Sequence, residues 1–191
     1  MTANSRRRAR RLIGAAAALG LAAAAHAAPV YSHVQPGAQV DFQATQMGVP
    51  MKGHFGSVSA QVHFAPQDLK ASRVEFSVAT ASVDAGSGQT DELLRGPDWL
   101  DAKADPQARF VSSAFQPDGP GRYWVSGEFT VRGRTHPLRV LVRTQPSGKA
   151  LLMQSDFKLE RSAYGLGGGS WADTGVVAAD IAVHVQLLAQ P

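Results

Sequence analysis

Residues 161–173, RSAYGLGGGSWAD, are the stretch with the most chemical potential, because four glycines alternate with an arginine, a tyrosine and a tryptophan. Glycine allows positive φ angles and close backbone approach, so the stretch could be a wide connection between two strands. Tyr164 and Trp171 are amphipathic, and they could close over an apolar ligand or pack on the rim of the fold. Both uses stay open.

The guanidinium group of Arg161 is a fixed fork of donors that suits phosphate or carbonyl oxygens. A buried Arg161 would need acceptors, either a carboxylate such as Asp173 or Asp84, or the polar head of a ligand. One hypothesis makes Arg161, Tyr164 and Trp171 the mouth of a binding site, with the glycine-rich loop moving to admit the ligand. The other ties the loop to an aspartate.

Residues that could support catalysis or bind a metal are scattered along the chain. The histidines beyond the first 27 residues have no pair at a short metal-ligand spacing: His33, His54, His63, His136 and His184. Nothing resembles the nucleophile motifs G-x-S-x-G or S-x-x-K. Asp98 and Asp101 could act as an acid and base pair, but acids beside a short helical turn are commonly caps. We expect no metal, no cofactor and no catalysis; a hydrolase is the least favoured alternative.

The first 27 residues have the order of a secretory signal: five arginines, an apolar run from Leu12 to Ala25, and a small-residue end, Ala25-His26-Ala27. An uncleaved anchor is the alternative, but this run of 14 residues is shorter than the roughly 20 that span a bilayer. We expect cleavage after Ala27, export to the periplasm by a route that stays open, and one domain over residues 28–191.

Removing the leader changes the charge of the protein. The leader holds five of the 19 basic residues and none of the 15 acids, so the remaining 164 residues carry 14 basic and 15 acidic residues. A net charge of −1 in place of +4 removes the main support for a nucleic-acid partner. Cysteine is absent from the sequence, which excludes disulfides, thiol catalysis and thiolate metal sites.

Most of the chain predicts β-strands, because apolar and polar residues alternate over short runs separated by turn signals. The alternating runs lie near residues 40–44, 58–64, 74–78, 123–131, 138–142 and 181–187. Hairpin-length connections favour a closed barrel or a sandwich. Residues 84–107 break this rhythm, since Thr90-Asp91-Glu92-Leu93-Leu94-Arg95 ends at Gly96-Pro97 and indicates a short helix.

Four short motifs in order resemble the YceI-like proteins, a family of exported bacterial lipocalin-like barrels associated with polyisoprenoid lipids. They are Gly53-His54-Phe55-Gly56, Pro106-Gln107-Ala108-Arg109-Phe110, residues 127–135 (GEFTVRGRT) and Arg161-Ser162-Ala163-Tyr164-Gly165. The segments around Trp99 and Trp171 resemble the branch of the family found beside cytochrome b561-type membrane proteins. Asp105 departs from the family pattern, where an aromatic residue is usual before the proline.

The resemblance implies an all-β, antiparallel lipocalin-like barrel of about eight strands, with one or two short helices between strands. It also implies an apolar lumen that holds a long isoprenoid chain, either a polyprenyl phosphate or an isoprenoid quinone. We predict that the ligand contacts are the following residues: Phe42, Phe76, Val125, Val140 and Val183 in the lumen, and Arg161, Tyr164 and Trp171 at the mouth.

A rival function is a non-catalytic module that docks on a membrane cytochrome b561-type partner, or that contacts the inner membrane transiently. The interior of the barrel separates these functions, since a lumen filled by side chains favours docking and a continuous apolar space favours a carrier.

Overall fold

The computed structural model describes residues 28–191, and the predicted leader, residues 1–27, lies outside the described residues. Within the described part, eleven strands, one α-helix and two short 3-10 helices follow one another. Their bounds are β1 (His33–Val34), β2 (Gln39–Gln46), β3 (Val49–Phe55), β4 (Val58–His63), β5 (Arg73–Ala79), η1 (Thr80–Ser82), β6 (Val83–Asp84), α1 (Gly88–Arg95), β7 (Gln107–Pro117), β8 (Arg122–Val131), β9 (Arg134–Ser147), β10 (Ala150–Glu160), η2 (Gly169–Trp171) and β11 (Asp180–Gln190).

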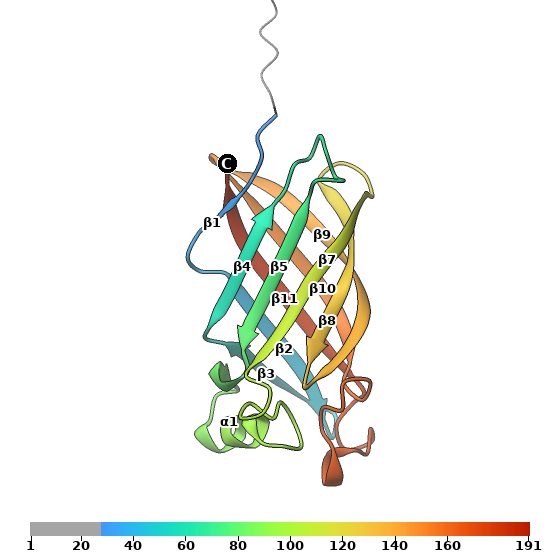
Figure 1. The fold of residues 1–191 in the computed structure, drawn as a ribbon. Coiled ribbons are helices and arrows are strands. Elements are labelled where there is room, and N and C mark those ends of the chain that lie inside the picture. The colour runs from blue at the N-terminus through green and yellow to red at the C-terminus, as the bar shows by residue number, and fades with distance from the viewer. Residues whose placement is uncertain (1–27) are drawn as a thin grey trace, which may run out of the picture.

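The strands form a single antiparallel sheet that curls into a barrel-shaped wall (Figure 1). The strand order is β4-β5-β7-β8-β9-β10-β11-β2-β3-β6, and β1 joins by pairing with β11. The edge of the sheet at β4 contacts the N-terminal segment. Just after β4, Phe64 exchanges backbone hydrogen bonds of 2.9 and 2.8 Å with Tyr31. The expected all-β antiparallel fold is confirmed.

The sheet holds more strands than the eight expected, for identifiable reasons. β1 and β6 are two-residue strands, too short to show alternation. β3 contains Pro50 and Gly53, which both weaken a strand pattern. In β7 the register shifts between Ser112 and Ala114, and this bulge interrupts the alternation of inward side chains.

Gly53 has a specific packing role in the wall. It pairs with Phe42 across β2 and β3, and Phe42 in turn pairs with Val183 on β11. A Cβ atom at Gly53 would lie only 2.4 Å from the ring of Phe42 and 2.7 Å from the backbone oxygen of Asp84. The Phe42 ring therefore crosses β3 at a position where a side chain does not fit.

The core consists of two clusters at opposite ends of the barrel. The terminal end, near Tyr31 and the C-terminus, is tightly packed, with Phe64, Val125 and Ala189 at most 1% exposed. The α1 end contains Trp99, Leu166 and Tyr164, around which many apolar side chains are only partly buried. Both clusters are flanked by partly buried apolar side chains, so burial alone does not place space for a ligand at one end of the barrel.

Helix α1 forms where the sequence predicts it. Ser87 caps its start, since the Ser87 hydroxyl accepts a hydrogen bond of 3.2 Å from the Thr90 amide, and Gly96 follows its last residue. Arg95 anchors the helix by donating to the carbonyls of Ala81 and Val83 at 2.8 and 2.9 Å. None of the eight residues of α1 is buried, so the helix lies on the end of the barrel as a cover.

Candidate functional site: an apolar cavity with one clamped and one open side

An apolar cavity of about 260 Å³ lies inside the barrel. Its lining reaches from Val125, Val140 and Leu187 at the terminal end to Leu94, Trp99 and Trp171 at the α1 end. The polar residues of the lining are Gln46, Lys52, Thr90, Gln154 and Ser155. Such a space can exclude water from a hydrocarbon chain, and its volume is near the lower end of the roughly 300–1,000 Å³ of small-molecule sites.

The structure brings most of the predicted ligand-binding residues together on this cavity. Six of them line it: Phe42, Phe76, Val125, Val140, Val183 and Trp171. Arg161 and Tyr164 are not among the lining residues. The predicted set therefore divides into residues on the cavity wall and residues behind it.

Arg161 is a buried structural residue in this fold, with a side chain only 1% exposed. All three guanidinium nitrogens donate to backbone carbonyls at 2.8 to 3.4 Å, those of Leu166, Gly167, Trp171, Asp173, Val177 and Ala178. Burial lowers the pKa of Arg161 from its ordinary value. Of the two uses left open for Arg161, the structure shows the internal one, with backbone carbonyls in place of a carboxylate of Asp173 or Asp84, and the predicted ligand contact is not seen on the cavity wall.

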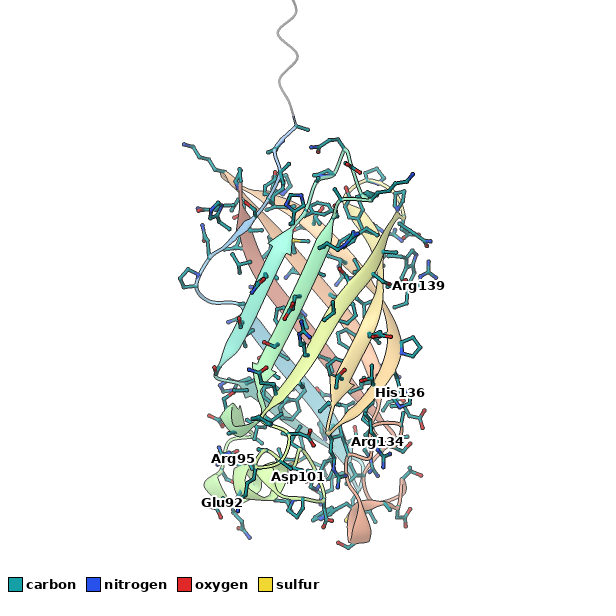
Figure 2. The ribbon with its side chains drawn as sticks, in the orientation of Figure 1. Glu92, Arg95, Asp101, Arg134, His136 and Arg139 are labelled. Carbon is teal, nitrogen blue, oxygen red and sulfur yellow. The ribbon has the colours of Figure 1, made fainter. Side chains whose placement is uncertain are left out.

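Tyr164 is also part of the core, being 4% exposed. Its ring packs edge-on against Phe129 and His136, with centroid distances of 5.3 and 5.0 Å. Burial raises the pKa of the Tyr164 hydroxyl. His136, which lies on β9 near the α1 end (Figure 2), is thereby occupied in packing.

The glycine-rich loop, residues 161–173, is bonded to the segment of residues 97–101, and we name the pair the clamped side. The amides of Gly167 and Gly168 both donate to the carbonyl of Asp98 at 2.7 Å. Arg132 donates to the carbonyls of Gly165 and Pro97, one in each half of the pair. Several glycines of the loop, Gly167 among them, have positive φ angles that these bonds hold in place.

A second part of the cavity's edge, which we name the open rim, consists of residues 47–51 at the β2–β3 turn together with α1. The Met47 amide of this rim donates to the Val176 carbonyl at 2.8 Å. Its apolar side chains are exposed: Met47 77%, Val49 58%, Met51 36% and Leu93 38%. Met51 and Leu93 also line the cavity, so the cavity reaches the surface here. Figure 1 shows the β2–β3 turn and α1 at the same end of the barrel.

Many residues of the cavity lining lie outside the predicted set, among them Trp99, Leu94 and Met51. Leu94 and Trp99 lie in the segment predicted to be helical, and adjacent leucines in a short polar helix were the available signal. Met51 gave little signal, because β3 shows no clear alternation. The predicted strands identified only the walls of the cavity.

The two aspartates considered for catalysis have backbone carbonyls that take part in the fold. The Asp98 carbonyl binds the glycine-rich loop, and the Asp101 carbonyl accepts hydrogen bonds from Ala104 and Asp105 at 2.9 and 2.8 Å. Among residues 28–191, no group of three or more His, Asp or Glu side chains is arranged to hold a metal ion. Nor does that part of the chain contain a helix long and apolar enough to cross a membrane.

Comparisons with known proteins agree on one family. The model of the YceI-like domain matches residues 31–189. A UPF0312 protein of Shewanella denitrificans is 28% identical over 113 residues, which cover 59% of this chain and 59% of that protein.

Two solved structures extend this likeness. BcnA of Burkholderia cenocepacia is 35% identical, with a TM-score of 0.78 over 80% of this chain and 96% of that one. A domain from Saccharophagus degradans, described as polyisoprenoid binding and implicated in plant cell wall breakdown, is 11% identical, with a TM-score of 0.65 over 84% and 97%. At that identity the likeness concerns the fold alone.

Proposed function

Because this chain belongs to the YceI-like domain family, we propose that it is an exported binding protein that holds a polyisoprenoid lipid in its barrel. The proposal takes its ligand class from the Saccharophagus degradans domain, which is described as polyisoprenoid binding. It takes its location, the periplasm, from the secretory pattern of residues 1–27.

The observation that carries the proposal is the apolar cavity and its lining of aliphatic and aromatic side chains. Each CH₂ group removed from water contributes about 0.8 kcal/mol, so a few isoprene units can supply micromolar affinity after the cost of association. A cavity of about 260 Å³ suits a short stretch of prenyl chain, and longer chains require lining side chains to move.

A docking module remains the rival function, and the interior of the barrel is the feature that separates the two. A module that only docks needs no internal space, and its lumen can be filled by its own side chains. The cavity therefore supports a carrier over a docking module.

Native mass spectrometry of the protein purified from the cells that produce it tests this proposal. We expect a protein mass beginning at Ala28, with a bound mass that fits an isoprenoid lipid and is released by organic solvent. A control variant, Val183→Trp, fills the cavity wall and should lose the bound mass while keeping the fold. An empty wild-type protein that also fails to take up added prenyl lipids would refute the carrier function.

The intact mass from the same experiment tests export separately. Residues 1–27 should be missing from the purified protein. A protein that keeps them and stays with the membrane fraction would contradict cleavage without bearing on the cavity.

A further inference from the structure

The β2–β3 turn carries a residue that its backbone conformation does not favour. Gln46 pairs with Val49, so the turn consists of Met47 and Gly48, and their φ angles are both positive, 48° and 81°. Two-residue turns of this kind favour asparagine, aspartate or glycine at the first position, because positive φ is strained for other residues. Methionine at position 47 therefore runs against the local backbone preference.

The side chains around this turn are apolar and exposed. The described part of the chain has five exposed large apolar side chains, and four of them lie on the open rim: Met47, Val49, Met51 and Leu93. Met47 is the most exposed of the five, at 77%. Residues 44–51 also include no charged residue. Exposed apolar side chains that gather in one place mark an interaction surface.

The turn is held in place by the segment that precedes β11. The Met47 amide donates to the Val176 carbonyl at 2.8 Å. The Ala178 amide donates to the Thr45 carbonyl at the same distance. The apolar tip is thus fixed at the α1 end of the barrel (Figure 1), where it points away from the core that could otherwise bury it.

The cavity indicates which kind of partner fits this surface. Met51 and Leu93 belong both to the cavity lining and to the exposed rim, so the apolar lining continues to the surface. Every CH₂ group of a prenyl tail that enters water is costly, so a tail can leave the cavity readily only where the rim meets another apolar phase. A lipid bilayer supplies such a phase.

The charges beside the apolar tip fit a bilayer surface without driving the contact. Lys52 follows the tip and is exposed, and its stem can lie with the apolar side chains while its ammonium stays among the head groups. Helix α1 carries two acids, Asp91 and Glu92, and one base, Arg95. Attraction to an anionic membrane is therefore weak, and the apolar side chains must supply the contact.

We propose that the open rim is a membrane-contact surface, on which Met47, Val49 and Leu93 enter the head-group region of a bilayer and bring the cavity next to its hydrocarbon phase. This inference rests on the proposed function and names the partner with which the cavity exchanges its ligand. The contact is weak and reversible, because a few apolar side chains bury little area.

Vesicle titration of the protein without added isoprenoid tests the contact by itself. One set of vesicles contains phosphatidylethanolamine and phosphatidylglycerol, and the other contains phosphatidylcholine alone. Met47→Trp serves as the reporter, since tryptophan keeps the tip apolar and its emission shifts to shorter wavelength when it leaves water. We expect this shift with both vesicles, with an affinity that changes less than about twofold between about 0.05 and 0.3 M salt.

Met47→Asn separates a role in membrane contact from a role in the fold. Asparagine tolerates positive φ, so the melting temperature should rise by about 2 °C. Co-sedimentation with the same vesicles should weaken about threefold, because an apolar side chain is lost from the tip. Val111→Thr is the matched control: Val111 is 37% exposed on β7, away from the rim, and its loss should leave vesicle binding unchanged.

Several outcomes would overturn the inference. They are no vesicle binding by the wild-type protein, equal binding by the wild type and Met47→Asn, and equal losses in Met47→Asn and Val111→Thr. A concentration-dependent dimer that Met47→Asn abolishes, with no vesicle binding, would assign the tip to a second copy of the chain and would also overturn it.

Lipid transfer separates this inference from the proposed function. Protein loaded with a fluorescent prenyl lipid is mixed with empty vesicles, and Met47→Asn should slow the transfer about threefold while retaining the same load. If the wild-type protein cannot be loaded, the carrier function fails, whatever the vesicle titration shows. If it loads and both proteins transfer at the same rate, the rim plays no part in exchange and only the membrane contact fails.

Discussion

On the clamped side of the cavity, the buried guanidinium of Arg161 donates to six backbone carbonyls, and the Asp98 carbonyl accepts from two amides. On the open rim, by contrast, the side chains of Met51 and Leu93 are more than one third exposed. Both sides border the same cavity. Hydrogen bonds hold both sides, since the Met47 amide on the open rim donates to the Val176 carbonyl. The sides differ in exposure, because the open rim exposes apolar side chains and the clamped side buries its arginine.

This difference shows that glycine content does not identify the moving part of the site. Gly165, Gly167 and Gly169 have positive φ angles, and backbone hydrogen bonds hold the loop in this conformation. These glycines therefore permit the fold of the loop and do not make it mobile. Helix α1 has eight residues and no buried side chain, and helices of this length are marginal without packing. We therefore expect a ligand to enter at the open rim.

The largest expected effect is on the clamped side. Arg161→Met leaves six buried carbonyls without their donor, which should lower the free energy of unfolding by about 3–5 kcal/mol. The melting temperature should fall by about 10 °C. Affinity for a prenyl ligand, measured per folded molecule, should stay unchanged.

The matched control on the open rim is Arg95→Met, since Arg95 donates to two carbonyls from α1 and its side chain is 37% exposed. Arg95→Met should lower the free energy of unfolding by about 1 kcal/mol. Equal destabilisation by the two variants would remove the distinction between the sides.

The next prediction concerns the two ends of the cavity wall. Val183 is half-buried and lines the cavity, so Val183→Trp should fill free space and weaken prenyl binding more than tenfold at little cost in stability. Val125 is 0% exposed within the tight cluster of the terminal end. Val125→Trp should overpack this cluster and lower the free energy of unfolding by about 1–3 kcal/mol. Thermal melts and a ligand titration of both variants measure this, and normal binding by Val183→Trp would contradict the cavity assignment.

A glycine pair compares the two sides at the level of the backbone. Gly167 has φ +75°, and a Cβ there would lie 2.4 Å from a guanidinium nitrogen of Arg161. Gly48, in the β2–β3 turn, has φ +81° with no atom within 4 Å of an added Cβ. Backbone strain should lower the free energy of unfolding of both alanine variants by about 1 kcal/mol. For Gly167→Ala the total loss should be about 2–4 kcal/mol, because the new methyl group also displaces the guanidinium of Arg161. Chemical denaturation of the two variants measures both losses, and equal free energies of unfolding would contradict this prediction.

The smallest effect is expected away from both sides, on the outer face of β10. Hydrogen bonds from His184 and then Arg143 lower the pKa of Asp156. Because the folded pKa is the lower one, the stabilisation is present above the ordinary pKa of 3.8 and is lost as the pH falls through the folded value. Asp156 is 51% exposed, so Asp156→Asn should lower the free energy of unfolding by no more than about 0.5 kcal/mol near pH 6, and by less as the pH falls through the folded pKa. A larger cost that persists in acid would show that this surface pair matters for more than its charge.

The sequence predicted the strands that alternate, the short helix and most of the cavity wall, because one buried face dictates a period of two. It could not reveal the partners of Arg161, since backbone carbonyls have no sequence signature. The sequence also could not show that the buried indole Nε1 of Trp99 has no hydrogen-bond partner, because this depends only on what surrounds the nitrogen in space. The exposure of Met51 and Leu93 depends on how the β2–β3 turn and α1 are placed, which is likewise a property of the folded chain.

Photoaffinity labelling tests the central claim, that an isoprenoid tail lies inside the barrel, most directly. The probe is a prenyl benzoquinone with a diazirine at the far end of its tail, and peptide mass spectrometry locates the adducts. We predict adducts in β8 and β9, around Val125 and Val140, that disappear in Val183→Trp. Adducts confined to the outer face of the sheet, or labelling that is equally strong in Val183→Trp, would contradict the account.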